Sequence, residues 1–279
     1  TANENIMKKG SDIKNGQVTL KAGTVLGAPQ IGVLAAIGMA NVNVYRVPYV
    51  AVLSTGPEVT EPGKELLPGK IYDINAYSLC AAVLESGANP LYRGVVPDNE
   101  TELRQALQNA LASADMVITS GGVSVGPKDL TPQIVGSLGK PGMIFSGVAL
   151  KPGKPVTLSL IEKKPIFSLP GHPAAALLTF HLFVRPIIQA MAGRPLAETE
   201  SLVAVSGARL FSAKGRRTFT TVQLRRDAQG KLIADPVESG ASGAITTLSK
   251  ADGYVEIPEN VQFIDIGEEV KVWLFKGNK

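Results

Sequence analysis

A glycine-rich loop is the part of this sequence best suited to chemistry. Residues 115–129 read Asp-Met-Val-Ile-Thr-Ser-Gly-Gly-Val-Ser-Val-Gly-Pro-Lys-Asp, so an apolar strand leads through Gly121 and Gly122 to a helix expected from Leu130. Glycines let the backbone approach a ligand closely, and a helix N-terminus offers free N–H groups to an anion. The pattern indicates a phosphate-binding loop. It matches neither common nucleotide-binding glycine motif, and a structural turn would explain it nearly as often.

Three acidic residues, Glu58, Asp98 and Asp129, stand just after expected strands. In an open α/β sheet ligands bind in the crevice at the carboxyl ends of the strands, so we expect these acids to converge there. Carboxylates beside a phosphate loop suit Mg²⁺, which takes one or two of them and completes its shell with phosphate oxygens and water. The structural alternative is that Asp98 and Asp129 cap the helices that follow, which is compatible with ligation.

Two proline-rich loops add cations and backbone donors. The sequence Lys-Pro-Gly-Lys-Pro at 151–155 presents Lys151 and Lys154, two point charges suited to an oxyanion. The sequence Leu-Pro-Gly-His-Pro at 169–173 places Pro173 at the first position of a long apolar helix, so the N-terminus of that helix faces a ligand. His172 is a candidate ligand or base. His181, within the helix, is expected to be partly buried and hydrogen-bonded.

A hydrolase is the minor alternative for the glycine loop. Residues 122–126 read Gly-Val-Ser-Val-Gly and match the nucleophile elbow of esterases. Such an enzyme needs an acid and then a histidine after Ser124, each in a usable loop. Asp129 follows Ser124 too closely, and Glu162 lies in an expected hairpin.

The hydrophobic pattern indicates a scaffold for these loops. From Tyr49 onward strands and helices alternate, which predicts βαβ units and a mostly parallel sheet. Short β-rich segments follow after residue 195 and predict a small all-β domain. We therefore expect an α/β fold with a central, mostly parallel sheet flanked by helices (49–195) and a C-terminal β-barrel-like domain (196–279). The expected strands cover 49–54, 90–96, 116–119, 143–148, 156–160 and 166–169, and the expected helices 76–86, 101–113, 130–138 and 174–191.

The first 48 residues are too short for a domain of their own. We expect a β-like segment at 17–26, a helix at 29–39 and an extended segment at 42–47.

Composition excludes several classes of protein. With 44% hydrophobic and 19% charged residues the chain is not disordered, and the single cysteine, Cys80, excludes an intrachain disulfide framework or a cysteine zinc cluster. The longest apolar runs fall short of the ~20 residues of a membrane span. A net charge of +4 with 5% aromatics favours small anions over nucleic acid. We expect a soluble, cytoplasmic protein.

Basic residues gather in the expected all-β domain. Seven lie between Arg209 and Lys231 against Asp227 alone, and we interpret them as the solvated face of a β-hairpin rather than as a binding strip.

Six motifs, in this order, resemble a known family. They are Ser54-Thr-Gly-x-Glu58, Val95-Val-Pro-Asp98, the loop 119–129, the loops 151–155 and 169–173, and Ser242-Gly-Ala-Ile-Thr-Thr-Leu-x-x-Ala-Asp-Gly253. Together they are similar to the molybdopterin molybdenumtransferases of the MoeA and gephyrin E-domain type, and the resemblance runs along almost the whole chain.

The resemblance implies a reaction and a set of site residues. The reaction is the Mg²⁺-dependent insertion of molybdenum, from molybdate, into adenylylated molybdopterin (molybdopterin-AMP), with loss of AMP. Glu58, Asp98 and Asp129 would be the essential acids, with Asp98 and Asp129 holding Mg²⁺. Substrate contacts would come from Thr55, Ser120, Gly121, Gly122, Val123, Lys151, Lys154, Pro170, Gly171 and Pro173.

The sequence also departs from the family. A serine and an arginine that the family is thought to use for molybdate are replaced by Ala175 and Thr221. The family's N-terminal portion is absent, so we expect residues 1–48 to be the remnant of a linker and dimerisation domain, and catalysis by this chain to be poor.

The resemblance leaves two alternatives open. One is the molybdopterin adenylyltransferase of the same superfamily, which the loop 151–155 and the all-β domain argue against. The other is a non-catalytic, gephyrin-like scaffold, which would carry an exposed apolar groove near the all-β domain. The expected partners are a second copy of the chain and the adenylyltransferase, with no nucleic acid and no membrane.

Overall fold

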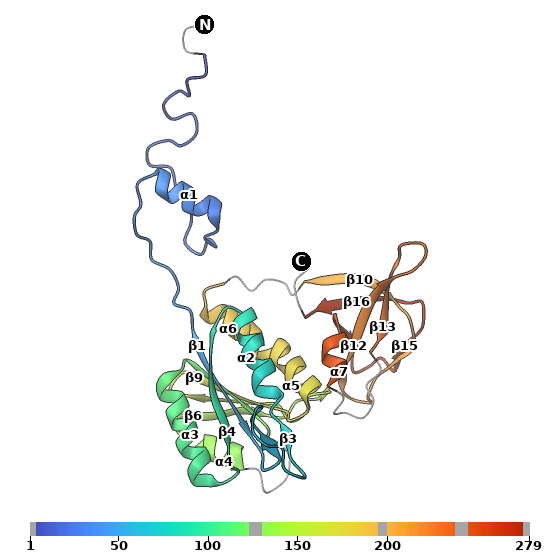
Figure 1. The fold of residues 1–279 in the computed structure, drawn as a ribbon. Helices are drawn as coiled ribbons and strands as arrows, with labels where there is room; N and C mark the ends of the chain where they lie inside the picture. Colours follow the sequence, from blue (N-terminus) through green and yellow to red (C-terminus); the bar gives the residue numbers. More distant parts are fainter. Residues whose placement is uncertain (1–3, 123–129, 195–199, 238–244, 276–279) are drawn as a thin grey trace.

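A computed structural model of the chain describes residues 4–122, 130–194, 200–237 and 245–275. Within these ranges six strands form the central sheet (Figure 1). In spatial order they are β4 (Asn89–Val96), β1 (Tyr49–Thr55), β5 (Met116–Ser120), β9 (Lys164–Leu169), β8 (Thr157–Ile161) and β6 (Pro141–Ser146). The first four are parallel to one another, and β8 runs antiparallel to both of its neighbours. The prediction of a mostly parallel sheet is therefore confirmed.

Helices cover both faces of this sheet (Figure 1). Side chains alternate along β1, so Val50 and Val52 share one core with α2 (Asn75–Glu85), while Ala51 and Leu53 share the other with α3 (Glu100–Ser113) and α4 (Leu130–Ser137). Ser54, two residues after Val52, points to the same side of β1 as Val50 and Val52, the side that faces α2. This parity decides which polar side chains meet at the end of the strand.

The expected long apolar helix is present but contains a π-helical turn. It consists of α5 (Pro173–Thr179), the π turn Phe180–Val184, and α6 (Arg185–Met191). Pro186 lacks an N–H group and crowds the preceding turn, and a wider turn relieves both problems. By length and composition alone this stretch could cross a membrane. In the structure Phe180, Val184 and Ile188 have no exposed surface and pack against the sheet, as in the core helix of a globular domain.

The C-terminal region forms a closed barrel among the described residues, as predicted. The strands follow one another as β13 (Leu232–Pro236), β10 (Ser201–Ser206), β16 (Glu269–Leu274), β14 (Gly253–Ile257) and β12 (Arg217–Arg226), and β12 pairs again with β13. A short strand from the first domain, β7 (Leu150–Lys151), pairs in parallel with Arg217 and Thr218 at the start of β12. The remaining elements are β11 (Leu210–Phe211), β15 (Phe263–Ile264) and α7 (Thr246–Lys250).

Ion pairs neutralise much of the basic surface of the barrel. Arg209 binds Asp265, Arg217 binds Glu256 and Glu259, and Arg225 binds Asp235. The interpretation of this face as a solvated hairpin surface fits these pairs better than an anion-binding strip does.

The segment before Tyr49 extends away from the sheet (Figure 1). Its helix, α1 (Ala28–Ala36), begins one residue before the start and ends three residues before the end of the predicted range 29–39, and it has no buried residue. The strand expected at 17–26 is wrong, because these residues are irregular and mostly exposed, as is the stretch 42–47. A β-strand needs a neighbour for its backbone groups, and none is present here among the described residues.

Candidate functional site

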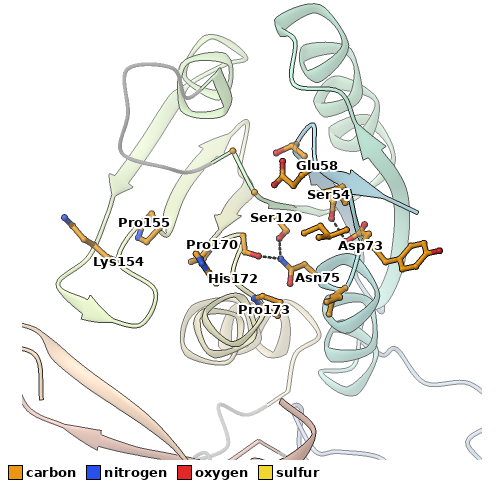
Figure 2. A pocket seen from close by; sticks show the side chains of 18 residues that line it. Ser54, Glu58, Asp73, Asn75, Ser120, Lys154, Pro155, Pro170, His172 and Pro173 are labelled. Carbon is orange, nitrogen blue, oxygen red and sulfur yellow. Dashed lines mark hydrogen bonds between the residues drawn. The ribbon is translucent and has the colours of Figure 1, made fainter. Parts of the chain in front are cut away.

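The carboxyl ends of the central strands open into a cavity of about 690 Å³ (Figure 2). Ser54 at the end of β1 is level with Ser120 at the end of β5, and Ser120 is level with Leu169 at the end of β9. The three loops that follow these strands therefore meet at one edge. A small parallel pair, β2 (Val59–Thr60) and β3 (Ile71–Tyr72), supplies an apolar wall. Both the position and the size are typical of a small-molecule site in an open α/β fold.

Most of the predicted contact residues line this cavity. They are Thr55, Glu58, Ser120, Gly121, Gly122, Lys154, Pro170, Gly171 and Pro173, together with His172. The glycine loop, the end of the lysine loop and the turn before α5 thus surround one space, although they are far apart in the sequence.

Close contacts with neighbouring residues leave no room for a side chain at the two glycines after β5. Gly121 has φ +91°, and a Cβ added there would lie 2.2 Å from the carbonyl oxygen of Thr55. At Gly122 a Cβ would lie 2.8 Å from Thr55 Oγ1 and 2.7 Å from Thr131 Oγ1. Among the described residues neither of these buried hydroxyls has a hydrogen-bond partner. The loop therefore leaves β5 with its backbone close against β1, and neither glycine places a side chain over the floor of the cavity.

Some predicted residues are not brought into the cavity. Asp98 follows β4 at the same edge of the sheet, but it is exposed and does not line the cavity. It does not cap α3 either, because Asn99 does so by accepting a hydrogen bond from the Glu102 N–H at 3.0 Å. Lys151 lies in β7 beside Thr218 of the barrel. Val123, Ser124 and Asp129 lie outside the described residues.

Sequence reasoning missed two polar residues at the start of α2. Asp73 is 3% exposed and accepts hydrogen bonds from Ser54 Oγ (2.9 Å) and from the Ala76 N–H (3.0 Å). Asn75 donates from Nδ2 to Ser120 Oγ (2.8 Å) and to the Gly171 carbonyl (2.7 Å) (Figure 2). A usable signal was present, because Asp three residues before a helical N–H is a capping pattern.

The Asp73 carboxylate also affects its neighbours. Burial, and then this carboxylate, raise the pKa of the Cys80 thiol to about 11. The same two causes raise the pKa of the Tyr92 hydroxyl. Both groups stay protonated at neutral pH, so neither is a nucleophile for this site.

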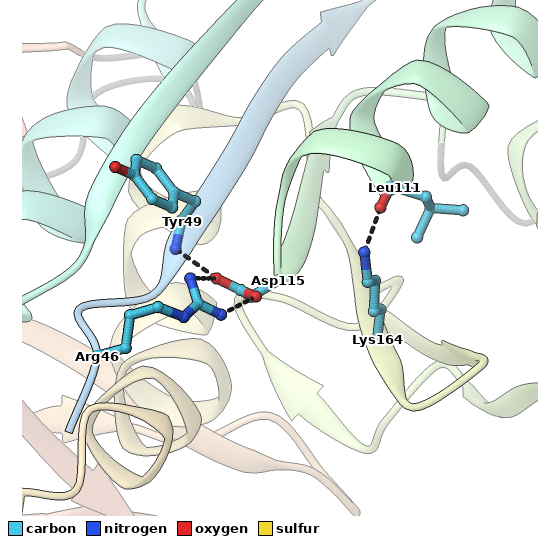
Figure 3. A network of polar contacts seen from close by, with 5 residues as sticks. All are labelled: Arg46, Tyr49, Leu111, Asp115 and Lys164. Atoms are coloured by element: carbon cyan, nitrogen blue, oxygen red, sulfur yellow. Dashed lines mark hydrogen bonds and ion pairs between the residues drawn. The ribbon is translucent and has the colours of Figure 1, made fainter.

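The opposite end of β5 is held by an ion pair with Arg46, which lies in the segment before Tyr49 (Figure 3). Arg46 donates to both carboxylate oxygens of Asp115, at 2.9 and 2.5 Å, and Asp115 also accepts from the Tyr49 N–H at 2.8 Å. The guanidinium therefore lowers the pKa of Asp115. The first residue of β1 is thus bonded to the residue just before β5 at the edge opposite the cavity.

His181 is set apart from the cavity and is only partly as expected. Its ring packs between Phe180 and Phe275, with centroids 5.8 and 5.0 Å away. Burial lowers its pKa to about 4. Among the described residues its buried Nδ1 has no hydrogen-bond partner, so the expected hydrogen bond is not found there.

The oxygen donors at this edge fit Mg²⁺ better than a metal that needs a protein cage. Among the described side chains no three His, Cys, Asp or Glu come together as a metal site. Mg²⁺ does not require such a cluster, since it binds through one or two carboxylates plus phosphate and water. Glu58 in the cavity and Asp98 at the same edge are hard oxygen donors of this kind.

Comparison with known proteins agrees with this architecture. Residues 51–190 match the family model described as "Probable molybdopterin binding domain", residues 203–275 match the MoeA C-terminal region (domain IV), and residues 1–38 match the MoeA N-terminal region (domain I and II).

Individual relatives match over nearly the whole chain. The molybdopterin molybdenumtransferase of Haemophilus influenzae is 34% identical over 97% of this chain and 67% of its own length, and that of Nostoc sp. is 37% identical over 96% and 62%. The crystal structure of a molybdopterin biosynthesis MoeA protein from Pyrococcus horikosii superposes with a TM-score of 0.84 at 42% identity, covering 97% of this chain and 65% of that one. The chain spans about two thirds of the length of these relatives, and it belongs to the MoeA family of molybdopterin molybdenumtransferases.

Proposed function

We propose that this chain binds molybdopterin-AMP in the cavity at the carboxyl edge of the central sheet and transfers molybdenum from molybdate to its dithiolene, releasing AMP. One observation carries the proposal. The same cavity presents bare glycine backbone, the Ser120 and Thr55 hydroxyls, a lysine and the start of the long helix, all of which bind anionic oxygen, beside an apolar wall that suits a flat heterocycle.

The lysines would bring the two anions together. Molybdate and the phosphates of the substrate repel each other, so the site must supply positive charge before the metal can reach the dithiolene sulfurs. Lys154 lines the cavity, and Lys151 lies three residues away on β7. We assign phosphate to Ser120, Gly121 and Gly122, and we assign Lys154 to the anionic oxygens of both the phosphate and the molybdate.

Magnesium would be held by Asp98 and Asp129, the second of which lies outside the described residues. When bound, the ion would neutralise phosphate charge and polarise the phosphoryl group. Glu58 lies against the glycine turn after β1, since a Cβ at Gly56 would be 2.8 Å from its Oε1. It is positioned to accept hydrogen bonds from donor groups of the substrate at the cavity mouth.

The proposal extends to the assembly and the compartment. We propose a homodimer acting in the cytoplasm, which receives its adenylylated substrate from the molybdopterin adenylyltransferase. The scaffold alternative has less support. That alternative needs an exposed apolar groove near the barrel. The cavity on the barrel is about 290 Å³ and is lined by apolar residues such as Val255, Pro258 and Trp273, but it is also lined by the charged residues Glu256, Glu269 and Lys271.

Calorimetry with ADP and Mg²⁺ tests the proposal. We expect saturable binding by the native chain and a loss of about tenfold or more in Lys154→Ala, because a cation that contacts phosphate contributes at least 1 to 2 kcal/mol. Lys214→Ala is the matched control, since it removes the same charge from an exposed loop of the barrel. Absence of binding at millimolar ADP, or equal losses in the two variants, would contradict the assignment.

A further inference from the structure

Two buried serines lie side by side on neighbouring strands at the floor of the cavity. Ser54 ends the α2 side of β1, and Ser120, its register partner, ends the same side of β5. They are 2% and 3% exposed, and both line the cavity. A hydroxyl can donate one hydrogen bond and accept two, so its neighbours decide which role remains for a ligand.

The Ser54 hydroxyl donates its hydrogen bond to a protein group, not to the cavity. Its Oγ donates a hydrogen bond to Asp73 Oδ1 at 2.9 Å, which uses its one proton. The same Oδ1 accepts the Ala76 N–H of the first turn of α2 at 3.0 Å, which fixes the carboxylate in place. The hydroxyl of Ser54 is therefore left with lone pairs only, and it faces the cavity as an acceptor.

Ser120 has the opposite arrangement. The Gly171 carbonyl can only accept, so the Asn75 atom 2.7 Å from it must be the amide nitrogen, and the amide orientation is settled. The same nitrogen donates to Ser120 Oγ at 2.8 Å. Among the described residues nothing accepts the proton of Ser120, which remains available to a ligand.

We propose that Asp73 and Asn75 are positioning residues that give the two serines opposite hydrogen-bonding roles, Ser120 as donor and Ser54 as acceptor. This inference rests on the proposed function and deepens it. An anionic oxygen, which only accepts, is directed to Ser120 and the adjoining glycine backbone. An N–H or O–H group of the same ligand is directed to Ser54. The site thereby selects a phosphorylated ligand with a hydrogen-bond donor close to its phosphate, and fixes which way round it binds.

A double-mutant cycle tests whether Asn75 acts through Ser120. The probe is inorganic pyrophosphate with Mg²⁺, and the measurement is the dissociation constant by calorimetry. Ser120→Ala removes one hydrogen bond to a charged group and is expected to weaken binding about 10- to 100-fold. Asn75→Ala is expected to weaken it about tenfold. The double variant is expected to be within about twofold of Ser120→Ala, because the proton that Asn75 orients is already absent.

Two further variants separate positioning from stability. Ser86→Ala removes a buried hydroxyl that bonds the Ala82 carbonyl at the other end of α2, so it destabilises the same helix but should bind pyrophosphate as the native chain does. If Asn75→Ala does not fold, Asn75→Asp keeps the shape. The carboxylate introduced by Asn75→Asp would accept the hydrogen bond of the Ser120 hydroxyl and repel the anion, so binding is expected to be weaker than in Ser120→Ala. Binding should recover as the pH falls below about 5 and this carboxylate becomes protonated.

The outcomes distinguish the two proposals. Pyrophosphate binding by the native chain with additive losses in the double variant would overturn the role of Asn75 and leave the anion site standing. Equal losses in Ser86→Ala and Asn75→Ala would also overturn that role, since destabilised α2 would then explain both. No binding by the native chain would overturn the inference and the proposed function together.

Discussion

Gly121→Ala is expected to destabilise the chain through a clash between neighbouring strands. The added Cβ would lie 2.2 Å from the Thr55 carbonyl oxygen, well inside van der Waals contact. Neither partner can easily withdraw, since both belong to the backbone at the paired ends of β1 and β5. The positive φ costs about 1 to 2 kcal/mol and the overpacking a further 1 to 3 kcal/mol, so we expect a loss of about 2 to 5 kcal/mol in the free energy of unfolding.

Gly69→Ala is the control for this prediction. Gly69 has φ +78° and a Cβ there would have no atom within 4 Å, so it suffers the backbone cost alone. Urea denaturation of both variants, read by fluorescence or circular dichroism, isolates the clash as the difference between them. ADP binding should also be lost in Gly121→Ala and kept in Gly69→Ala. Equal stabilities for the two variants would refute the argument that the glycine is required by close approach of β1.

Three other predictions concern regions outside the cavity. Arg46→Ala should lower the unfolding free energy only slightly, because the Arg46 side chain is 67% exposed. The loss should shrink in high salt, and it should also shrink as the pH falls below about 4, where the unfolded chain begins to bind the Asp115 proton and the lowered pKa of Asp115 in the fold contributes progressively less stability. A loss that is independent of salt would argue against an ion pair. His181 stays neutral in the fold down to about pH 4 while the unfolded chain binds its proton below about 6.5, so stability should fall across that interval, and His181→Phe should flatten the fall in a series of unfolding curves. Cys80, with a pKa of about 11, should react slowly with a thiol reagent at pH 8 in the native chain and rapidly in urea; fast native labelling would contradict its burial.

Much of the fold could be predicted because its signals are local. The apolar runs at 49–54 and 116–119 are β1 and β5 to within a residue, since strands buried on both faces have continuous hydrophobic sequences. The hairpin around Glu162 and Lys163 is also as expected, and both residues have positive φ. The strand expected at 17–26 is not formed, because a β-strand needs a neighbouring strand for its backbone groups and none lies beside this segment in the described part of the chain.

The candidate site was predicted in part for a similar reason. Glycine and proline motifs mark loops, and strand order then brings loops from Thr55, Ser120 and Gly171 to one edge. The roles of Asp73 and Asn75 depend on contacts over 19, 45 and 96 residues of sequence, which no local pattern encodes. Lys151 and Lys154 look equivalent in sequence, yet only Lys154 lines the cavity, because β7 pairs Lys151 with the barrel.

That pairing has a mechanical consequence. The five residues from Lys151 to Pro155 begin as a strand of the barrel and end in the wall of the cavity, and Gly153 between them is pressed against Thr179, since a Cβ there would lie 2.4 Å from that side chain. Such a short, tightly packed connection transmits displacement instead of absorbing it. Any shift of the barrel relative to α5, the helix that carries Thr179, would move the Lys154 ammonium relative to the glycine loop. The barrel strand β12 therefore holds one end of the segment that carries Lys154, and a chain cut near residue 195 would lose that support.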